Sequence, residues 1–482
     1  MAGTPARVFI EEVQTELSPV ELFGIFRPRK HCFFLDSGMD PAKLGRYSFM
    51  GAEPFLTISS RGGDVSVERE GRMQQLEDNP FDVLGEFLRE YQAAPPGDLP
   101  FTGGAVGYFS YDLCHFIEKL PKTAVEDLGF AECFLGFYDG ILVVDNLSGK
   151  VFAAAVGFPE LDEAGRYTRA KTTLAELRNR VTNYKVPAEA QTLKPLAVTG
   201  ITLKSNFSRQ YYLQAVATAR EYISAGDIFQ VNISQRFETA LPIAPFELYR
   251  RLREINPAPF ASYLDTGDMC VVGASPERFL KVNGREVETR PIKGTRPRGQ
   301  TPAEDQALAA ELMASAKDRA ENVMIVDLER NDVGRVCRFG SVRVTGLAEL
   351  EEFPTVFHLT STVVGELAEG KDRIDLLKAT FPGGSITGAP KVRAMEIIDE
   401  LEPTRRSVYT GSIGYLGFDG NMDLNIVIRT ILVKNNKAYF QVGGGIVYDS
   451  VPEQEYQETL DKARALIEAL SLSPRAGVEI TG

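Results

Sequence analysis

Short apolar runs mark strands in the first part of the chain. Phe55-Leu56-Thr57-Ile58 and Gly140-Ile141-Leu142-Val143-Val144 have the composition and length typical of β-strands. A stretch with helical spacing follows from about Asp162 to Asn183. Pro187 to Pro195 then combines two prolines with small and polar residues, which predicts a linker. The pattern divides the chain into an N-terminal region, residues 1–185, and a second region, residues 200–472.

In the second region, helical and strand patterns alternate. Ser208 to Gly226 predicts an amphipathic helix, and Asp227 to Phe237 alternates like a strand. Near the end, the pattern predicts a meander with turns at Asp419-Gly420 and Asn435-Asn436, followed by a closing helix from Glu453 to Leu470; its strands are Gly411 to Phe418, Met422 to Val433, and Ala438 to Val442. Meandering strands with helices between them indicate an α+β fold.

Composition and charge narrow the classes of function. The chain has 482 residues, 44% of them hydrophobic, and a formal net charge of -13. An acidic surface repels polyanions, so we expect no nucleic-acid partner. No apolar run has the length of a membrane span, and Met1 to Glu12 lacks the pattern of a secretion signal. The five cysteines are scattered without CxxC spacing, which favours reduced thiols and a cytoplasmic location.

Acidic residues at helical spacing are the first candidates for chemistry. Asp318 and Glu321 lie three positions apart, as do Glu455 and Glu458, so each pair shares one face of its helix. If two such faces were opposed, the four carboxylates would be too costly to bring together without a divalent cation between them, and Mg²⁺ prefers a few carboxylates together with water and an anionic ligand. The alternative is that both pairs are solvated helix surface.

Glycine-rich segments are candidates for anion binding. Phe381 to Lys391 contains Gly, Ser and Thr and leads into a helical pattern, with Pro390 at a position suited to the first turn. Such a loop offers N–H groups to an anion, although it lacks the ending of a nucleotide P-loop. Gly443-Gly444-Gly445 ends a predicted strand, where backbone N–H groups can approach a carboxylate. The alternative is a pair of tight turns.

Two basic residues stand in apolar surroundings. Arg429 interrupts the predicted strand Leu424 to Leu432, where it either forks onto a substrate carboxylate or faces solvent. Lys293 lies in Pro291-Ile-Lys-Gly-Thr295. A lysine held in an apolar pocket loses its proton readily and becomes a nucleophile, but most lysines are surface residues.

Together these strings resemble the chorismate-utilising enzymes, which include anthranilate synthase component I, aminodeoxychorismate synthase component I, and the isochorismate and salicylate synthases. The resemblance is dense over roughly residues 205–470. It implies two large antiparallel sheets packed as a sandwich with helices outside, both regions contributing strands. Lys293 and the loop Ser385-Ile-Thr-Gly-Ala-Pro-Lys391 look like the aminodeoxychorismate type. Gln230 stands where the hydroxylating enzymes place a lysine base, which disfavours a hydroxylating reaction.

The resemblance also implies a role for each candidate residue. The assignments are Lys293, Glu277 and His358 as catalytic residues; Gly294, Thr295, Ser385, Tyr409, Arg429, Gly443, Gly444, Gly445 and Lys462 as substrate-binding residues; and Asp318, Glu321, Glu455 and Glu458 around Mg²⁺. Glu321 and Glu458 would hold the metal directly, and Asp318 and Glu455 through water. Relatives usually have Glu at the position of Asp318, and the shorter side chain of Asp318 reaches less far toward a metal ion. His358 is expected near the substrate, without a defined step.

The implied reaction is amination of chorismate at C4 to 4-amino-4-deoxychorismate, on the route to 4-aminobenzoate and folate. Glu277 would protonate the departing hydroxyl, Lys293 would add to C2, and ammonia would then enter at C4. The sequence has no glutaminase signature, so a glutamine amidotransferase subunit is the expected partner. Phe34 to Ser37 is similar to the tryptophan-binding region of relatives, which leaves a bound tryptophan open.

Two rival interpretations remain at this point. Anthranilate synthase component I shares the metal, the substrate and the type of partner, but it aminates at C2 and releases pyruvate. Lys293 is the residue that discriminates against it. A non-enzymatic binding protein with the same fold is the other rival, and the complete acidic, glycine and lysine motifs argue against it.

Overall fold

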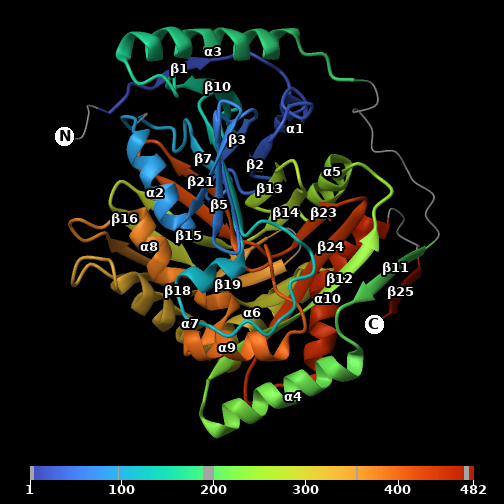
Figure 1. Ribbon diagram of the computed structural model, residues 1–482. Coiled ribbons are helices and arrows are strands. Elements are labelled where there is room, and N and C mark those ends of the chain that lie inside the picture. Colours follow the sequence, from blue (N-terminus) through green and yellow to red (C-terminus); the bar gives the residue numbers. More distant parts are fainter. Residues whose placement is uncertain (1–4, 96, 188–199, 354–355, 472–476, 482) are drawn as a thin grey trace.

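Two large sheets form the frame of the molecule in a computed structural model (Figure 1). The structure describes residues 5–95, 97–187, 200–353, 356–471 and 477–481. Among the described residues, the strands of the two sheets pair antiparallel, except that β11 and β25 run parallel. The predicted linker falls outside the described residues from position 188 onward. Both regions of the chain contribute strands to each sheet, as predicted.

Within the described residues the larger sheet has 13 strands. Its strands, in spatial order, are β1 (Phe9–Glu12), β10 (Lys150–Ala155), β9 (Ile141–Asp145), β3 (Tyr47–Gly51), β2 (Phe33–Asp36), β13 (Phe260–Asp265), β14 (Cys270–Ser275), β23 (Thr430–Lys434), β24 (Lys437–Ile446), β12 (Gln230–Ala240), β11 (Gly200–Ser205) and β25 (Gly477–Thr481), with β20 (Gly388–Ala389) pairing beside β12.

The second sheet has 12 strands in the described part of the chain. Its strands, in spatial order, are β17 (Ile292–Pro297), β19 (Val356–Glu366), β16 (Glu286–Arg290), β15 (Arg278–Asn283), β22 (Met422–Ile426), β21 (Ser412–Gly417), β7 (Gly104–Phe109), β8 (Cys133–Tyr138), β4 (Leu56–Arg61), β5 (Asp64–Arg69) and β6 (Arg72–Glu77), with β18 (Arg343–Glu352) also pairing with β19.

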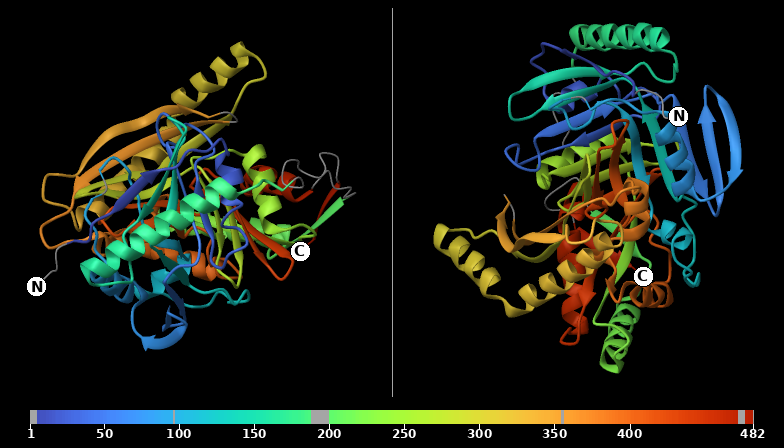
Figure 2. Two further views of the ribbon diagram at one scale, coloured as in Figure 1. Left: turned by 90° about the horizontal axis from the view of Figure 1, so that it is seen from above. Right: turned by 90° about the vertical axis from the view of Figure 1, so that its left-hand side faces the viewer.

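Helices lie outside the two sheets, and α6 projects away from the rest of the molecule (Figure 2). The α-helices are α1 (Pro19–Phe23), α2 (Pro80–Glu90), α3 (Glu163–Asn183), α4 (Arg209–Ala225), α5 (Pro245–Ile255), α6 (Pro302–Ala314), α7 (Ala316–Gly334), α8 (Arg373–Thr380), α9 (Lys391–Leu401) and α10 (Pro452–Ser471); the short 3₁₀ turns are η1 (Tyr111–Phe116) and η3 (Gly384–Ile386).

A buried core between the sheets confirms the predicted sandwich. Phe33 and Phe49 from the larger sheet pack in one cluster with Tyr138 and Tyr415 from the other. The Phe33 and Tyr138 rings meet edge to face at 4.5 Å, and those of Phe49 and Tyr415 at 5.4 Å. Edge-to-face rings at such distances are favourable beyond the area they bury.

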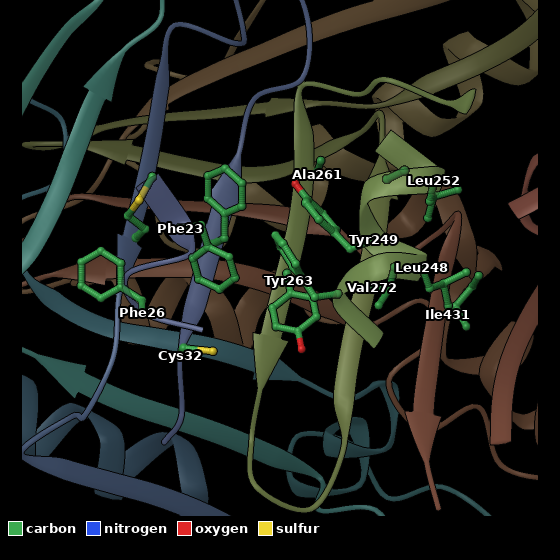
Figure 3. Packing of buried hydrophobic residues seen from close by; sticks show 14 of the residues in the cluster. Phe23, Phe26, Cys32, Leu248, Tyr249, Leu252, Ala261, Tyr263, Val272 and Ile431 are labelled. Atoms are coloured by element: carbon green, nitrogen blue, oxygen red, sulfur yellow. The ribbon is translucent and has the colours of Figure 1, made fainter. Parts of the chain in front are cut away.

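The outer face of the larger sheet carries its own core, formed with α1, α3, α5 and α10. Phe23 of α1 stacks on Phe34 of β2 at 5.1 Å, and Tyr249 and Leu252 of α5 pack over β13 and β14 (Figure 3). A third core lies on the outer face of the second sheet, under α2 and α8. The helices therefore bury the faces that the sandwich leaves open.

Helix caps explain why the sequence pattern located the long helices well. Asp162 caps α3 by accepting from the N–H of Gly165, and Ser208 caps α4 by accepting from Tyr211. Gly226 ends α4 at φ 85°, a conformation that glycine adopts without strain. These signals are local, so the predicted helices over 162–183 and 208–226 are confirmed.

The predicted strand Met422 to Val433 was wrong. It is two strands in different sheets, β22 in the second sheet and β23 in the larger one. The chain crosses between the sheets through 427–429, and Arg429 takes a left-handed φ of 53°. One straight strand cannot belong to both sheets, so the chain must turn between β22 and β23. The alternation of apolar and polar residues does not show where this turn lies.

The glycine run lies at the end of a strand, as predicted, whereas the position of one proline needs correction. Gly443-Gly444-Gly445 pairs with Ser234, Ile233 and Asn232 of β12, and β24 ends one residue later at Ile446. Pro390 caps α9, which begins at Lys391. The loop before it forms η3 and the short strand β20, so several of its N–H groups are already bonded. Strand pairing across the sheet decides these features.

Candidate active site

Glu277 is a buried carboxylic acid in the connection between β14 and β15. Its Oε1 accepts a hydrogen bond of 2.6 Å from the Ser385 hydroxyl and a longer one of 3.5 Å from the N–H of Ile292. Burial raises the pKa of Glu277, and the Ser385 bond and the charge of Lys293 oppose that shift. A carboxyl group whose pKa is raised keeps its proton to a higher pH, which suits the role of a general acid.

Lys293 on β17 meets the same loop residue. Its Nζ donates to the carbonyl oxygen of Ser385 at 3.0 Å. Burial lowers the pKa of Lys293, while the carboxylates of Glu321, Glu277 and Glu458 act in the opposite direction. Glu277 and Lys293 therefore bind the same residue: Glu277 contacts the Ser385 hydroxyl, and Lys293 contacts the Ser385 carbonyl. Burial favours the neutral form of each group.

The glycines of β24 let polar side chains approach the strand closely. A Cβ at Gly444 would lie 3.3 Å from Oε2 of Glu455 and 3.4 Å from Oε1 of Glu458. A Cβ at Gly445 would lie 2.6 Å from Nε2 of Gln230, which any larger residue would displace. The run of glycines therefore keeps space at the point where α10 and β12 meet the strand.

Several buried polar atoms beside these glycines have no hydrogen-bond partner among the described residues. They are Nε2 and Oε1 of Gln230, Oδ1 of Asn232 and Oε2 of Glu455. Unsatisfied buried groups of this kind are rare in proteins, because each costs about 1–3 kcal/mol. Their concentration around Gly443 to Gly445 marks a place where a ligand, an ion or water completes the bonding.

One acidic residue of α7, Glu321, lies near one acidic residue of α10, Glu458. Burial raises the pKa of Glu321, and the charge of Glu458 adds to that shift, so the two helices lie within electrostatic range. Lys462 binds Oε1 of Glu458 at 2.6 Å and the carbonyl of Gly443 at 2.9 Å. Asp318 accepts from Arg296 at 3.2 Å.

The carboxylates of the site are not arranged as a ready-made metal centre. In the described part of the chain, no three His, Cys, Asp or Glu residues form a group spaced to hold a metal ion. Glu458 forms an ion pair with Lys462, and Glu321 lies 4.0 Å from Lys317. In this structure the two carboxylates are therefore balanced by lysine side chains. The unpartnered Oε2 of Glu455 beside Gly444 is the observation that fits a cation at this position.

Arg429 and Tyr409 lie near one another, because the charge of Tyr409 acts on Arg429. Arg429 Nη1 donates to the carbonyl of Lys462 at 2.7 Å, and burial lowers its pKa. Tyr409 is buried, and the guanidinium of Arg406 lies 5.9 Å from its ring centre. The left-handed backbone at Arg429 turns its side chain toward α10, which answers the alternative of a solvent-facing arginine.

His358 of β19 pairs with Thr295 of β17. Thr295 Oγ1 lies 2.9 Å from His358 Nδ1, and the His358 ring meets Phe353 edge to face at 5.2 Å. Burial lowers the pKa of His358 to about 4, so its imidazole is neutral near pH 7. The pairing of β17 with β19 brings these two residues together.

The structure therefore joins most of the predicted site residues through direct contacts. Lys293, Ser385 and Glu277 form one hydrogen-bonded set, and Gly443, Lys462, Glu458 and Arg429 form another. The charges of Glu458 and Lys462 act on Lys293, so the two sets are neighbours. Asp318 lies against Gly294, where a Cβ would stand 3.2 Å from its Cγ, but its carboxylate is bound by Arg296.

Sequence reasoning missed Glu329, a buried carboxylate of α7 whose Oε1 accepts from the N–H of Gly384 at 3.0 Å. A signal for it existed. Asn322, Ile325, Val326 and Val333 form the buried stripe of α7, and Glu329 stands within that stripe. A charged residue at a position reserved for apolar side chains indicates a specific partner in the fold.

The region Phe34 to Ser37 lies on β2, in the middle of the larger sheet. Phe34 is buried against Phe23, while Asp36 accepts from Tyr249 at 2.7 Å and from Arg253 at 2.5 Å. Ser37 donates to the carbonyl of Tyr47 at 2.9 Å. In this structure these polar groups are bonded within the protein itself.

No helix in the described ranges combines the length and the apolar character that a membrane crossing requires. The fold and these two side chains define the class of the molecule: an α+β protein with a buried carboxyl group at Glu277, a partly buried lysine at Lys293, and a glycine-rich strand near them.

Comparison with known proteins supplies the family. The family model described as chorismate binding enzyme matches residues 30–468. Anthranilate synthase component 1 of Acetivibrio thermocellus is 43% identical over 462 residues, 94% of this chain and 92% of that protein. Aminodeoxychorismate synthase component 1 of Bacillus subtilis is 41% identical over 446 residues, 92% of this chain and 93% of that protein. The crystal structure of anthranilate synthase component I from Streptococcus pneumoniae superposes with a TM-score of 0.76 at 36% identity, covering 87% and 92% of the two chains.

This chain belongs to the chorismate-binding enzyme family, and it is a chorismate-utilising enzyme. Its relatives include both anthranilate synthases and an aminodeoxychorismate synthase, at nearly equal identity.

Proposed function

We propose that this enzyme aminates chorismate at C4 to give 4-amino-4-deoxychorismate. The observation that carries the proposal is the shared contact of Glu277 and Lys293 with Ser385. Burial shifts the pKa of the acid upward and that of the lysine downward. These shifts favour the protonated carboxyl and the neutral amine, the forms that a displacement with a poor leaving group requires.

The proposed reaction has two displacements. Lys293 Nζ adds to C2 of the ring, both ring double bonds shift by one position, and the C4 hydroxyl leaves as water with the proton of Glu277. The new C2–N ammonium returns a proton to Glu277. Ammonia then adds at C4, both double bonds shift back, and the C2–N bond to Lys293 breaks. The amine of Lys293 leaves as a neutral group once the proton from the incoming ammonia has been transferred within the site. The enolpyruvyl side chain is untouched.

A bound Mg²⁺ would neutralise a substrate carboxylate and orient the ring. Glu321, Glu455 and Glu458 would hold it, and the unpartnered Oε2 of Glu455 beside Gly444 supports this position. Asp318 is a weaker candidate, because Arg296 already binds its carboxylate. Arg429, Lys462 and the N–H groups of Gly443 to Gly445 would bind the carboxylates of chorismate. Thr295, Gly294, Tyr409 and the neutral His358 would line the remaining substrate.

Ammonia would come from a glutamine amidotransferase subunit. Two features support this partner: relatives of both kinds carry the name component 1, and the described part of this chain contains no exposed cysteine that would serve a glutaminase. The orphan amide of Gln230, beside Gly445, is a neutral group and cannot activate water as a base would.

The second candidate is anthranilate synthase component I, favoured by the 43% identity to the Acetivibrio thermocellus enzyme. Ammonia would then attack C2 directly, and pyruvate would be lost. The test is a product assay with purified chain, chorismate, Mg²⁺ and ammonium, analysed by mass. Aminodeoxychorismate retains the enolpyruvyl group; a product lacking it would replace the first candidate with the second.

A further inference from the structure

The turn Gly384–Ile386 is held at three consecutive points by ionisable side chains. Lys293 binds the carbonyl of Ser385, Glu277 accepts the Ser385 hydroxyl, and Glu329 accepts the N–H of Gly384 at 3.0 Å. The first two are the proposed nucleophile and acid. Glu329 reaches the same turn from α7.

Glu329 is built into this position with little freedom. It is only 2% exposed, and its Oε2 lies 3.5 Å from the Thr289 hydroxyl. A Cβ at Gly384 would stand 3.0 Å from Oε1 of Glu329 and 2.7 Å from the Leu328 side chain. Glycine at 384 therefore permits the carboxylate to bind the backbone directly.

The charges that face Glu329 come from three elements. Lys391 of α9 attracts it, Asp332 of its own helix repels it, and Glu277 repels it from the β14–β15 connection. Lys391 is bound by Asp332 and by the carbonyl of Thr380, so its charge is shared. Burial, the largest influence, raises the pKa of Glu329 to about 7. Its charge therefore changes across the range in which the enzyme would work.

We propose that Glu329 is a positioning residue for the reaction: it fixes the Gly384–Ser385 turn against Glu277 and Lys293, and its negative charge helps Glu277 to retain a proton. This inference rests on the proposed role of Glu277 as the acid. An ionised Glu329 makes the loss of a second proton from the neighbouring Glu277 less favourable. The helix α7 thereby acts on the chemistry without touching the substrate.

Two variants separate the two parts of this role. Glu329→Gln keeps an oxygen that accepts from Gly384 but removes the charge. We expect its rate of chorismate consumption to match the wild type at pH 6, where Glu329 is largely protonated. At pH 8.5 we expect kcat to be several-fold lower with KM unchanged, because the alkaline limb moves to lower pH. Glu329→Leu removes the acceptor as well, and kcat should fall about tenfold at every pH.

Asp139→Asn is the matched control. Asp139 is also a buried carboxylate, it accepts from the N–H groups of Val156 and Gly157, and burial raises its pKa to about 6. It lies between β8 and β9, so its variant should change stability and leave the pH profile unchanged. The proposal is overturned if Glu329→Gln follows the wild type at all pH values, or loses the same fraction at pH 6 as at pH 8.5. If Glu329→Leu does not fold, Glu329→Gln still decides.

Product identity is a separate result. Chorismate consumption is followed in every variant whatever product forms, so anthranilate from the wild type would remove the proposed product without deciding the role of Glu329. The mass of the product therefore tests the proposed reaction, and the pH profile tests the role of Glu329. Either proposal can be contradicted without the other.

Discussion

The Ser385 hydroxyl donates a hydrogen bond of 2.6 Å to Oε1 of Glu277, across 108 positions of sequence. This bond stabilises the ionised carboxylate, so it opposes the burial that raises the pKa of Glu277. The same serine carries the carbonyl that binds Lys293. One residue thus sets both the geometry of the proposed acid and the pH at which it loses its proton.

Ser385→Ala should therefore shift the pH dependence in a defined direction. Loss of the hydroxyl raises the pKa of Glu277 further, so the alkaline limb of kcat/KM should move to higher pH. We expect kcat to fall about tenfold, because the acid is no longer held in place. Ser412→Ala, which removes another buried hydroxyl bonded to a backbone carbonyl, is the control. An alkaline limb that stays in place would contradict the assignment of Glu277.

Lys293→Ala tests the proposed nucleophile. Loss of a covalent nucleophile normally costs orders of magnitude, so amination at C4 should slow by about 10²-fold or more. We expect the residual product to shift toward anthranilate, because ammonia can then attack C2. Chorismate incubated with the wild type without ammonia should leave a mass adduct on the peptide that contains Lys293. Wild-type rates in the variant, with no adduct on the native chain, would rule out the covalent route.

Glu458→Gln tests the proposed metal site. The wild type should be stabilised by Mg²⁺ in thermal unfolding, by about 2.7 kcal/mol at 100 times the Kd, because an ion that binds the folded state shifts the equilibrium. The variant should lose most of this stabilisation together with Mg²⁺-dependent turnover. Asp461→Asn on the same helix removes an exposed carboxylate that pairs with Arg464 and should behave as wild type. Equal Mg²⁺ stabilisation in both variants would place the metal elsewhere.

His358 should contribute to acid sensitivity. Its pKa is lowered from 6.5 to about 4 in the folded state, so between these values the unfolded chain binds more protons. The free energy of unfolding therefore falls as pH drops from 6.5 toward 4, by about 3 kcal/mol for this residue. His358→Gln should flatten that part of the curve in denaturant titrations at pH 4, 5 and 7.

His115 provides the comparison for this measurement, because burial also lowers its pKa to about 4, at a place remote in sequence from His358. His115→Gln should remove its own share of the slope and leave the share of His358. A His358→Gln curve parallel to that of the wild type would show that the imidazole is not held neutral by the fold.

The sequence alone determined the features that depend on neighbouring residues. Caps at Asp162 and Ser208 fixed the helices α3 and α4, and i,i+3 spacing placed the acidic pairs on single helix faces. The family motifs carried the family assignment, which the match over residues 30–468 confirms. Helix caps and helix faces can be predicted without knowledge of the fold, because helix geometry depends on residues only a few positions apart.

Only the tertiary structure decided which elements meet. Period-two alternation looks the same in either sheet, so nothing in Met422 to Val433 showed that the chain changes sheets at Arg429. The hydrogen bond between Ser385 and Glu277, and the contact of Glu329 with Gly384, join segments far apart in sequence. Strand pairing and burial create these contacts, and burial then shifts the pKa values on which the proposed chemistry depends.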